Sequence, residues 1–257
     1  MNHLQKLFIA IQFLTRLPTP TKFQRCWSME DLRESVHMFP LVGVLVGLAA
    51  CLVYVAAVSL NLPLVVATIL AVATQILMTG ALHEDGLADV CDGFGGGHTI
   101  EQKLAIMRDS RLGTYGAIGL ILGLGLRLAA IVHLAEHGDV WFVVAGLIAA
   151  ATLSRAAMPL AMLFMPQARP EGLAASAGRP RQSKSFVSAA LGGIAVFLCL
   201  PPVEATIVIV VSIVSAALFL DLSRRQIGGI TGDVLGGLQQ VLDILVLVIA
   251  AALVRPG

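Results

Sequence analysis

The densest group of chemically active side chains in this sequence is the acidic stretch His83-Glu84-Asp85-Gly86-Leu87-Ala88-Asp89-Val90-Cys91-Asp92-Gly93. Asp85, Asp89 and Asp92 are spaced i, i+4 and i+7, so on a helix their carboxylates share one face. Like charges at this spacing repel, and a cation between them removes that cost. Oxygen ligands without thiolates select Mg²⁺, Mn²⁺ or Ca²⁺. The stretch predicts a metal site at these three aspartates; the alternative is a solvated acidic helix start just outside a membrane.

A second polar group lies near the C-terminus, where a glycine-rich segment ending at Asp233 precedes Gln240 and Asp243. On a helix these three side chains share one face. Asp243 lies inside an apolar run, where an acidic side chain is costly and therefore a functional candidate. If this face lies opposite the first group, Asp233 adds a metal ligand to a binuclear site that clamps both oxygens in phosphoryl transfer. Two neighbours of Asp233 are expected to contact the ligand: Thr231 and Gly232.

The segment from Met107 to Gly116 has the composition of a phosphate-binding loop. Its arginines suit oxyanions through bidentate guanidinium contacts, and the free N–H groups of the helix expected after it do so as well. The alternative is that the two arginines only anchor the chain at the cytoplasmic membrane surface. The predicted phosphate-binding residues are Arg108, Ser110, Arg111 and Gly113.

Three further residues stand at positions that favour function. His83 is a candidate general base, metal ligand or outer-shell orienting group, or else a structural histidine at a helix boundary. Arg155 lies inside an apolar run, where a charge needs a cavity or a carboxylate partner. We expect it to bind substrate phosphate or to balance the acidic group, the alternative being a structural salt bridge. Arg127 has a similar setting, and a purely structural pairing accounts for it more easily.

The elements that must position these residues are membrane helices. The 257 residues are 57% apolar and 13% charged, whereas soluble domains carry about 25% charged residues. The formal net charge of +1 gives no reason to expect nucleic acid as a partner. The four cysteines lack the paired spacing of a disulfide framework or a zinc site.

We therefore predict an all-α, polytopic integral membrane protein that forms a single domain over residues 1–257. Leu4, Leu7, Phe8, Ile11 and Leu14 form the apolar stripe of an N-terminal amphipathic helix. This helix either lies on the membrane surface or packs against the cytoplasmic face of the protein itself. About seven transmembrane helices are expected, at residues 38–60, 62–82, 115–135, 140–165, 186–200, 203–220 and 234–254.

The positive charges support this topology. All Lys and Arg residues except Arg127, Arg155 and Arg255 fall before the first span or in the 83–114, 166–185 and 221–233 loops, on one side of the membrane. The opposite loops contain none. By the positive-inside rule, the side that carries these Lys and Arg residues is cytoplasmic, and the acidic motif lies on the same side.

Together the motifs resemble the cobalamin synthase family. They are His83-x-Asp85-Gly86-Leu87-Ala88-Asp89-x-x-Asp92-Gly93, the segment 108–114, and Thr231-Gly232-Asp233-x-Leu235-Gly236. The segments Phe13-Leu14-Thr15-Arg16-Leu17-Pro18 and Phe39-Pro40-Leu41-x-Gly43 fit the family as well, so the resemblance runs nearly end to end.

The resemblance implies an adenosylcobinamide-GDP ribazoletransferase, a multi-pass enzyme of the bacterial cytoplasmic (inner) membrane that uses Mg²⁺ on its cytoplasmic face. The 3′-hydroxyl of α-ribazole, or of α-ribazole 5′-phosphate, attacks the corrinoid-side phosphate of adenosylcobinamide-GDP. GMP leaves, and the product is adenosylcobalamin or its 5′-phosphate. Further partners expected are the lipid bilayer, a second copy of the chain and other enzymes of the corrinoid pathway.

On this basis we assign roles to individual residues. Asp85, Asp89, Asp92 and Asp233 are expected to hold Mg²⁺, and Arg111 and Arg155 to neutralise the pyrophosphate. In phosphoryl transfer a protein contributes mainly by positioning the reactants and by stabilising charge. The predicted catalytic residues are His83, Asp89, Arg111 and Arg155.

Two positions depart from the family pattern, and two other functions compete. Glu84 stands where we expect an apolar residue, and Gln240 stands where we expect an acid, which weakens the case for a ligand there. CDP-alcohol phosphotransferases share the chemistry, but their Asp-Gly-x-x-Ala-Arg signature lacks its arginine here. A divalent-cation transporter would place its acids near the midplane and contain an inverted repeat, which is not apparent.

Overall fold

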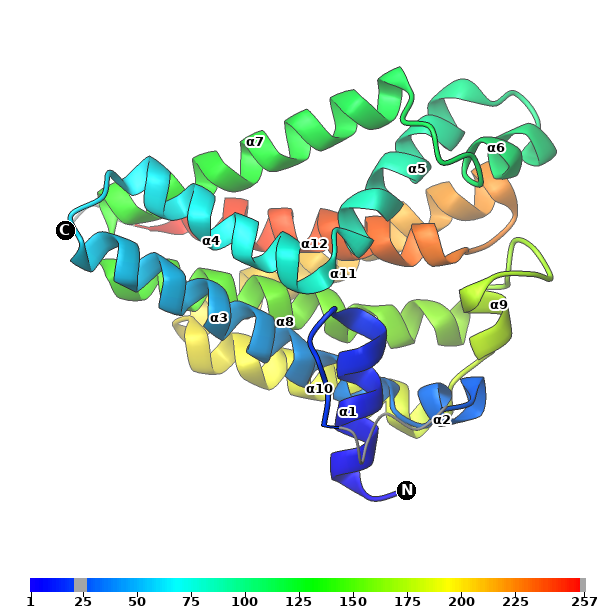
Figure 1. Cartoon of the computed structure of the whole chain (residues 1–257), viewed down its shortest axis with the longest axis horizontal. Coiled ribbons are helices and arrows are strands. Elements are labelled where there is room, and N and C mark those ends of the chain that lie inside the picture. The colour runs from blue at the N-terminus through cyan, green and yellow to red at the C-terminus, as the bar shows by residue number, and fades with distance from the viewer. Residues whose placement is uncertain (21–26, 255–257) are drawn as a thin grey trace.

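The computed structural model describes residues 1–20 and 27–254, so the surface charges counted at Lys22, Arg25 and Arg255 lie outside the described residues. The described chain is a bundle of long helices (Figure 1), with one isolated β-bridge between Gln167 and Ile230. In chain order the helices are α1 (His3–Leu14), α2 (Met29–Arg33), the 3₁₀ helix η2 (Val36–Met38), α3 (Phe39–Ser59), α4 (Leu64–Thr79), α5 (Leu82–Gly96), α6 (Ile100–Ile106), α7 (Thr114–His137), α8 (Val140–Phe164), α9 (Leu173–Ala177), α10 (Gln182–Cys199), α11 (Pro202–Ile227) and α12 (Gly232–Leu253).

The helix lengths and composition confirm an all-α, multi-pass membrane protein. Six described helices are long and apolar enough to cross a bilayer, and a bent pair, α4 with α5, brings the total to as many as seven. α4 alone spans about 24 Å, somewhat less than the ~30 Å hydrocarbon core. The six are Val36–Ser59, Thr114–His137, Val140–Phe164, Gln182–Cys199, Pro202–Ile227 and Gly232–Leu253.

A sharp bend separates the apolar helix α4 from the acidic helix α5. The two axes differ by 88°. Both linking residues are left-handed, Gly80 with φ 64° and Ala81 with φ 58°, a conformation that a glycine adopts freely and an alanine only at a cost. A Cβ at Gly80 would lie 2.7 Å from the Arg16 side chain, so only glycine fits there. The acidic motif therefore forms a helix of its own, turned away from the preceding span.

Helices α8 and α12 form the centre of the bundle. α8 packs against α3, α10 and α12, and α12 packs against α5, α7 and α11. α3 approaches α8 closely through Gly43 and Gly47, since a Cβ at Gly47 would lie 2.9 Å from the Ile148 Cα and one at Gly43 would overlap the Ala151 carbonyl. This Gly-xxx-Gly spacing allows backbone contact between membrane helices.

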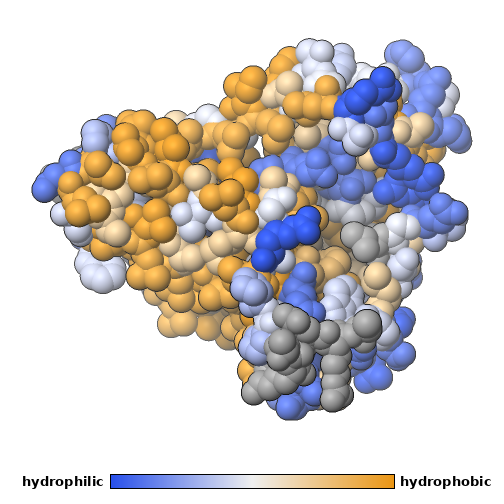
Figure 2. All heavy atoms as spheres, in the orientation of Figure 1, coloured by the Kyte–Doolittle hydropathy of each residue, from blue (hydrophilic) through white to orange (hydrophobic). Residues whose placement is uncertain are grey.

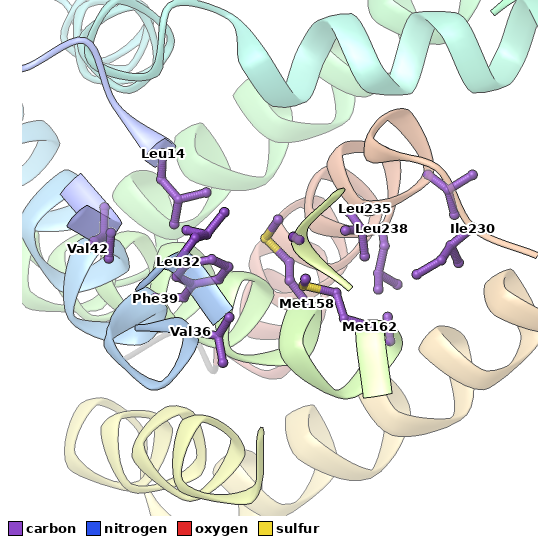
Figure 3. Close-up of a cluster of buried hydrophobic side chains, with 14 of the residues drawn as sticks. Leu14, Leu32, Val36, Phe39, Val42, Met158, Met162, Ile230, Leu235 and Leu238 are labelled. Atoms are coloured by element: carbon purple, nitrogen blue, oxygen red, sulfur yellow. The ribbon is translucent and has the colours of Figure 1, made fainter. Parts of the chain in front are cut away.

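The N-terminal helices pack onto one end of this bundle. α2 begins with a capping box in which Ser28 and Asp31 cap each other's backbone N–H groups. One face of α1 packs against the protein itself, because its residues Ile9, Ala10, Ile11 and Leu14 are buried. That α1 also lies at a membrane surface stays a prediction. A cluster of buried hydrophobic side chains joins these helices to α8 and α12 (Figure 3). Its members include Leu14, Leu32, Phe39, Met158 and Leu235.

Polar residues gather at the same end of the molecule. Figure 2 shows hydrophobic surface over much of the bundle and a hydrophilic zone at the right, where α5, α6 and α9 lie in Figure 1. Basic residues connect the elements there: Lys103 contacts Gln226, Arg108 contacts Glu171, and Arg181 contacts Glu34. We call this region the polar end.

Candidate active site

The two predicted acidic groups meet where α5 crosses α12. The contact is tight because Gly86 has no side chain: a Cβ there would lie 2.7 Å from the Asp233 carbonyl oxygen and 3.1 Å from the Gly236 Cα. Asp89 consequently interacts electrostatically with Asp233 across the crossing, as it does with Asp85 and Asp92 along its own helix. The structure thus brings Asp85, Asp89 and Asp233 together, and we call these three carboxylates the acidic cluster.

A small cavity of about 90 Å³ adjoins this cluster. Its polar lining comes from His83 and Asp85 on α5 and from Gly232 and Asp233 at the start of α12. His83 is 1% exposed, and its Nε2 has no hydrogen-bond partner. The remaining walls are apolar and come from α1, α2, α3, α8, α9 and α12: Phe13, Leu14, Leu32, Phe39, Met158, Met162, Ala177 and Leu235, with Leu82 of α5. A ligand here would meet carboxylates and one imidazole on one side and hydrocarbon on the other.

Asp92 is held against the start of α7. Its Oδ2 accepts a hydrogen bond from the Gly113 N–H at 2.7 Å, and its Oδ1 accepts one from the Gly116 N–H at 2.8 Å. A side chain at either glycine would collide with the carboxylate. Asp92 therefore satisfies free N–H groups at the start of α7, where a negative charge is also favoured by the helix dipole. Of the four predicted metal ligands, it is the one with both oxygens already engaged.

The predicted phosphate-binding loop faces solvent. Arg111 donates to Asp109, with Nη2 2.5 Å from Oδ2, and this hydrogen bond lowers the pKa of the Asp109 carboxyl. Arg108 lies 3.7 Å from Glu171 in an exposed pair. Ser110 is exposed as well, so of the four predicted phosphate-binding residues Gly113 alone contacts an acid of the motif. The structure does not bring the two arginines into contact with the acidic cluster.

Arg169, which the sequence indicated only as a surface charge, contacts the acidic cluster. Arg169 lies in the loop after α8, with Nη2 3.4 Å from Asp233 Oδ2, and it also interacts electrostatically with Asp89. Asp233 Oδ2 accepts a second hydrogen bond, from Thr231 Oγ1 at 3.1 Å. Thr231 in turn caps α12 by accepting from the Val234 N–H. No sequence motif marks Arg169, because its position depends on a loop contact distant in the chain.

A second charged group lies beneath the acidic cluster, inside the bundle. Arg127 on α7 lies 3.1 Å from Asp243 and 3.5 Å from Glu84, and it also donates to Gln75. Gln240 donates to the same Glu84 oxygen at 3.0 Å. We call Glu84, Arg127, Asp243, Gln75 and Gln240 the buried network; all are at most 8% exposed.

Arg155 belongs beside this network. It is 3% exposed, and its Nη1 donates to the Ala151 carbonyl of its own helix at 3.0 Å. It interacts electrostatically with Asp243, Arg127 and Glu84. The structure places Arg155 near His83 but does not make it part of the cavity lining.

Comparison with known proteins decides the family. Residues 6–251 match the model of a family described as cobalamin-5-phosphate synthase. The chain belongs to this family. Adenosylcobinamide-GDP ribazoletransferase of Bradyrhizobium diazoefficiens is 43% identical over 98% of the chain and 95% of its own length. The proteins of that name from Azorhizobium caulinodans and Rhizobium etli are 42% and 39% identical, over 96% and 93% of the chain and 95% and 93% of their own lengths. No solved structure matches.

Membership of the cobalamin-5-phosphate synthase family makes the chain a transferase of cobalamin biosynthesis, as the sequence motifs predicted. The two departures from the expected pattern contact each other, since Gln240 hydrogen-bonds to Glu84. This hydrogen bond crosses the α5–α12 contact. Both side chains belong to the buried network, and the three carboxylates of the acidic cluster are unaffected.

The donor chemistry of the acidic cluster fits Mg²⁺. Asp85, Asp89 and Asp233 offer hard oxygen atoms, and their mutual repulsion is balanced only in part by Arg169. Within residues 1–20 and 27–254, no three such side chains are placed to ligate one common ion. Mg²⁺ is usually held by one or two carboxylates together with waters and substrate phosphates, so the arrangement suits an ion that arrives with a nucleotide.

Proposed function

We propose that this chain is an adenosylcobinamide-GDP ribazoletransferase. It joins adenosylcobinamide-GDP to α-ribazole or α-ribazole 5′-phosphate and releases GMP, at the cytoplasmic face of a bacterial cytoplasmic membrane. The observation that carries the proposal is the acidic cluster with Arg169 beside it, at the polar end of a membrane bundle whose relatives bear that name. Basic residues at the same end support the cytoplasmic assignment.

In this reaction the ribazole 3′-hydroxyl oxygen forms a bond to the corrinoid-side phosphorus. The bond from that phosphorus to the GMP oxygen breaks, GMP leaves with the electron pair, and the hydroxyl proton passes to a base. We assign His83 as that base, because His83 lines the cavity and its buried Nε2 has no hydrogen-bond partner. The apolar walls suit an acceptor that carries a hydrophobic ring beside its hydroxyl groups.

Mg²⁺ is the proposed cofactor, and one or two of the carboxylates of Asp85, Asp89 and Asp233 would hold it together with waters and substrate phosphates. When bound, the ion neutralises charge on the phosphate oxygens. The carboxylates of Asp85 and Asp233 line the same cavity as His83. Asp92 contributes by fixing α7 against α5, through its hydrogen bonds to Gly113 and Gly116.

The test is turnover by purified protein reconstituted in liposomes with Mg²⁺, adenosylcobinamide-GDP and α-ribazole. The expected result is GMP and a corrinoid phosphodiester in equal amounts, with no GMP when α-ribazole is omitted. Release of CMP from a CDP-lipid would favour a CDP-alcohol phosphotransferase instead. Passage of divalent cations across the liposome without GMP release would overturn the enzyme assignment.

A further inference from the structure

The loop that carries Arg169 is fixed to the start of α12 by backbone contacts. The Ala168 N–H donates to the Ile230 carbonyl and the Ile230 N–H donates to the Pro166 carbonyl, both at 2.9 Å. A side chain at Gly229 would overlap the Pro166 carbonyl, so glycine permits this approach. Although its residues come from a connection between helices, the loop holds Arg169 in a defined position beside Asp233.

The guanidinium of Arg169 is only partly used. Its side chain is 15% exposed, and Nη2 faces Asp233 at 3.4 Å. Nη1 is buried without a hydrogen-bond partner. A buried donor without an acceptor is costly, so it indicates that an acceptor binds there when the protein works. An arginine presents its donors in a planar fork, and this geometry matches the oxygens of a phosphate.

The other arginines considered for phosphate binding lack this combination. Arg111 is exposed and already paired with Asp109, and Arg108 is exposed beside Glu171. Arg155 also keeps a free donor, its Nε, but its charged neighbours are Asp243, Arg127 and Glu84 of the buried network. Arg169 combines a free donor with contact to the acidic cluster.

We infer that Arg169 binds the diphosphate of the nucleotide-activated substrate, with Nη1 donating to a phosphate oxygen while Nη2 remains at Asp233. This inference rests on the proposed function and adds a substrate-binding residue to it. Its charge reduces repulsion between the carboxylates and the incoming diphosphate, and it stabilises the negative charge that the leaving GMP acquires as the P–O bond breaks.

The experiment compares Arg169→Gln, Arg169→Lys and a control, Arg179→Gln, which removes an exposed arginine from the same connection. Liposome-reconstituted protein is assayed for GMP release and, separately, for affinity toward adenosylcobinamide-GDP without α-ribazole. We expect Arg169→Gln to lower kcat/KM for adenosylcobinamide-GDP and its affinity by about 10- to 100-fold, with the KM for α-ribazole little changed. Arg169→Lys keeps the charge but loses the fork and should recover only part of the loss. The control should match the wild type.

The outcomes separate the inference from the proposed function. If the wild type releases GMP and Arg169→Gln stays within about twofold of the control in both assays, the inference is wrong and the function stands. If the wild type binds adenosylcobinamide-GDP in an Arg169-dependent manner without releasing GMP, the inference stands and the function is wrong. If the wild type does neither, both are wrong. Should Arg169→Gln fail to fold, Arg169→Lys decides: affinity equal to the wild type overturns the inference.

Discussion

Glu84 and Asp85 are neighbours on α5, yet they belong to two differently built groups of charges. Glu84 joins the buried network, where Arg127 faces two carboxylates and two glutamines contribute hydrogen bonds. Asp85 joins the acidic cluster, where three carboxylates share the guanidinium of Arg169. With Arg155 beside it, the first group has two arginines for its two carboxylates, whereas the second has one arginine for three carboxylates.

The difference indicates how one helix serves structure and chemistry at once. Inside a membrane a charge persists when it is paired, because desolvation is otherwise too costly. The buried network meets this condition and ties α5 to α4, α7 and α12. Excess charge at the acidic cluster is compensated only in part by Arg169, which is why we propose that a cation binds there. Breaking the first group should therefore affect stability, and breaking the second should affect turnover.

The largest effect is expected from Arg127→Met, which leaves Glu84 and Asp243 buried without their counter-ion. We expect the free energy of unfolding to fall by about 3–5 kcal/mol, as for other buried pairs that lose one partner. Chemical denaturation in mild detergent measures it. The matched control is Arg224→Met, which removes an exposed arginine at the end of α11 and should change stability little. Equal stability of the two variants would show that the network contributes nothing.

The next largest effect concerns turnover. Asp89→Asn removes the central charge of the acidic cluster, and we expect GMP release to fall by at least about 100-fold, since even outer-shell changes at metal sites cost 10–100-fold. Membrane insertion and stability should be retained. Asp221→Asn, which changes an exposed aspartate paired with Arg225, is the control. Near-full activity of Asp89→Asn would make the metal assignment wrong.

A smaller effect is expected from Gly86→Ala, which leaves every charge in place. The added Cβ would lie 2.7 Å from the Asp233 carbonyl, so α5 and α12 must separate by a few tenths of an ångström. We expect GMP release to fall about 10-fold, because reacting groups tolerate little displacement. Gly125→Ala, where a Cβ meets no other atom within 4 Å, supplies the comparison in the same assay. Similar activity of the two variants would mean that the close helix crossing does not position the cluster.

Much of the fold was predictable because membrane helices are defined by local composition. The expected spans at 38–60, 115–135, 140–165 and 234–254 correspond closely to α3, α7, α8 and α12. The bend after α4 was not predictable, since the left-handed alanine at position 81 is imposed by tertiary packing. Hydropathy likewise placed the end of the sixth span at 220, whereas α11 continues to Ile227.

In the candidate site, the proximity of the acids was more predictable from the sequence than the partners of the other charged groups. Periodicity placed Asp85 and Asp89 on one helix face, and the second acid group supplied Asp233. The sequence did not reveal that Asp243 pairs with Arg127 or that Asp92 holds the start of α7, because both partners are distant in the chain. Arg169 reaches the cluster through a loop contact that leaves no periodic signal. Charges can be located from a sequence more readily than their partners.

The most direct test of the division between structure and chemistry is the same chemical change at adjacent positions. GMP release per folded molecule is measured for Glu84→Gln and Asp85→Asn in liposomes with Mg²⁺, alongside the stability of each variant. We predict that Asp85→Asn folds normally and loses about 100-fold in turnover, whereas Glu84→Gln is less stable and turns over within a few-fold of the wild type. Equal turnover of the two variants, or a greater loss of turnover in Glu84→Gln, would contradict the account.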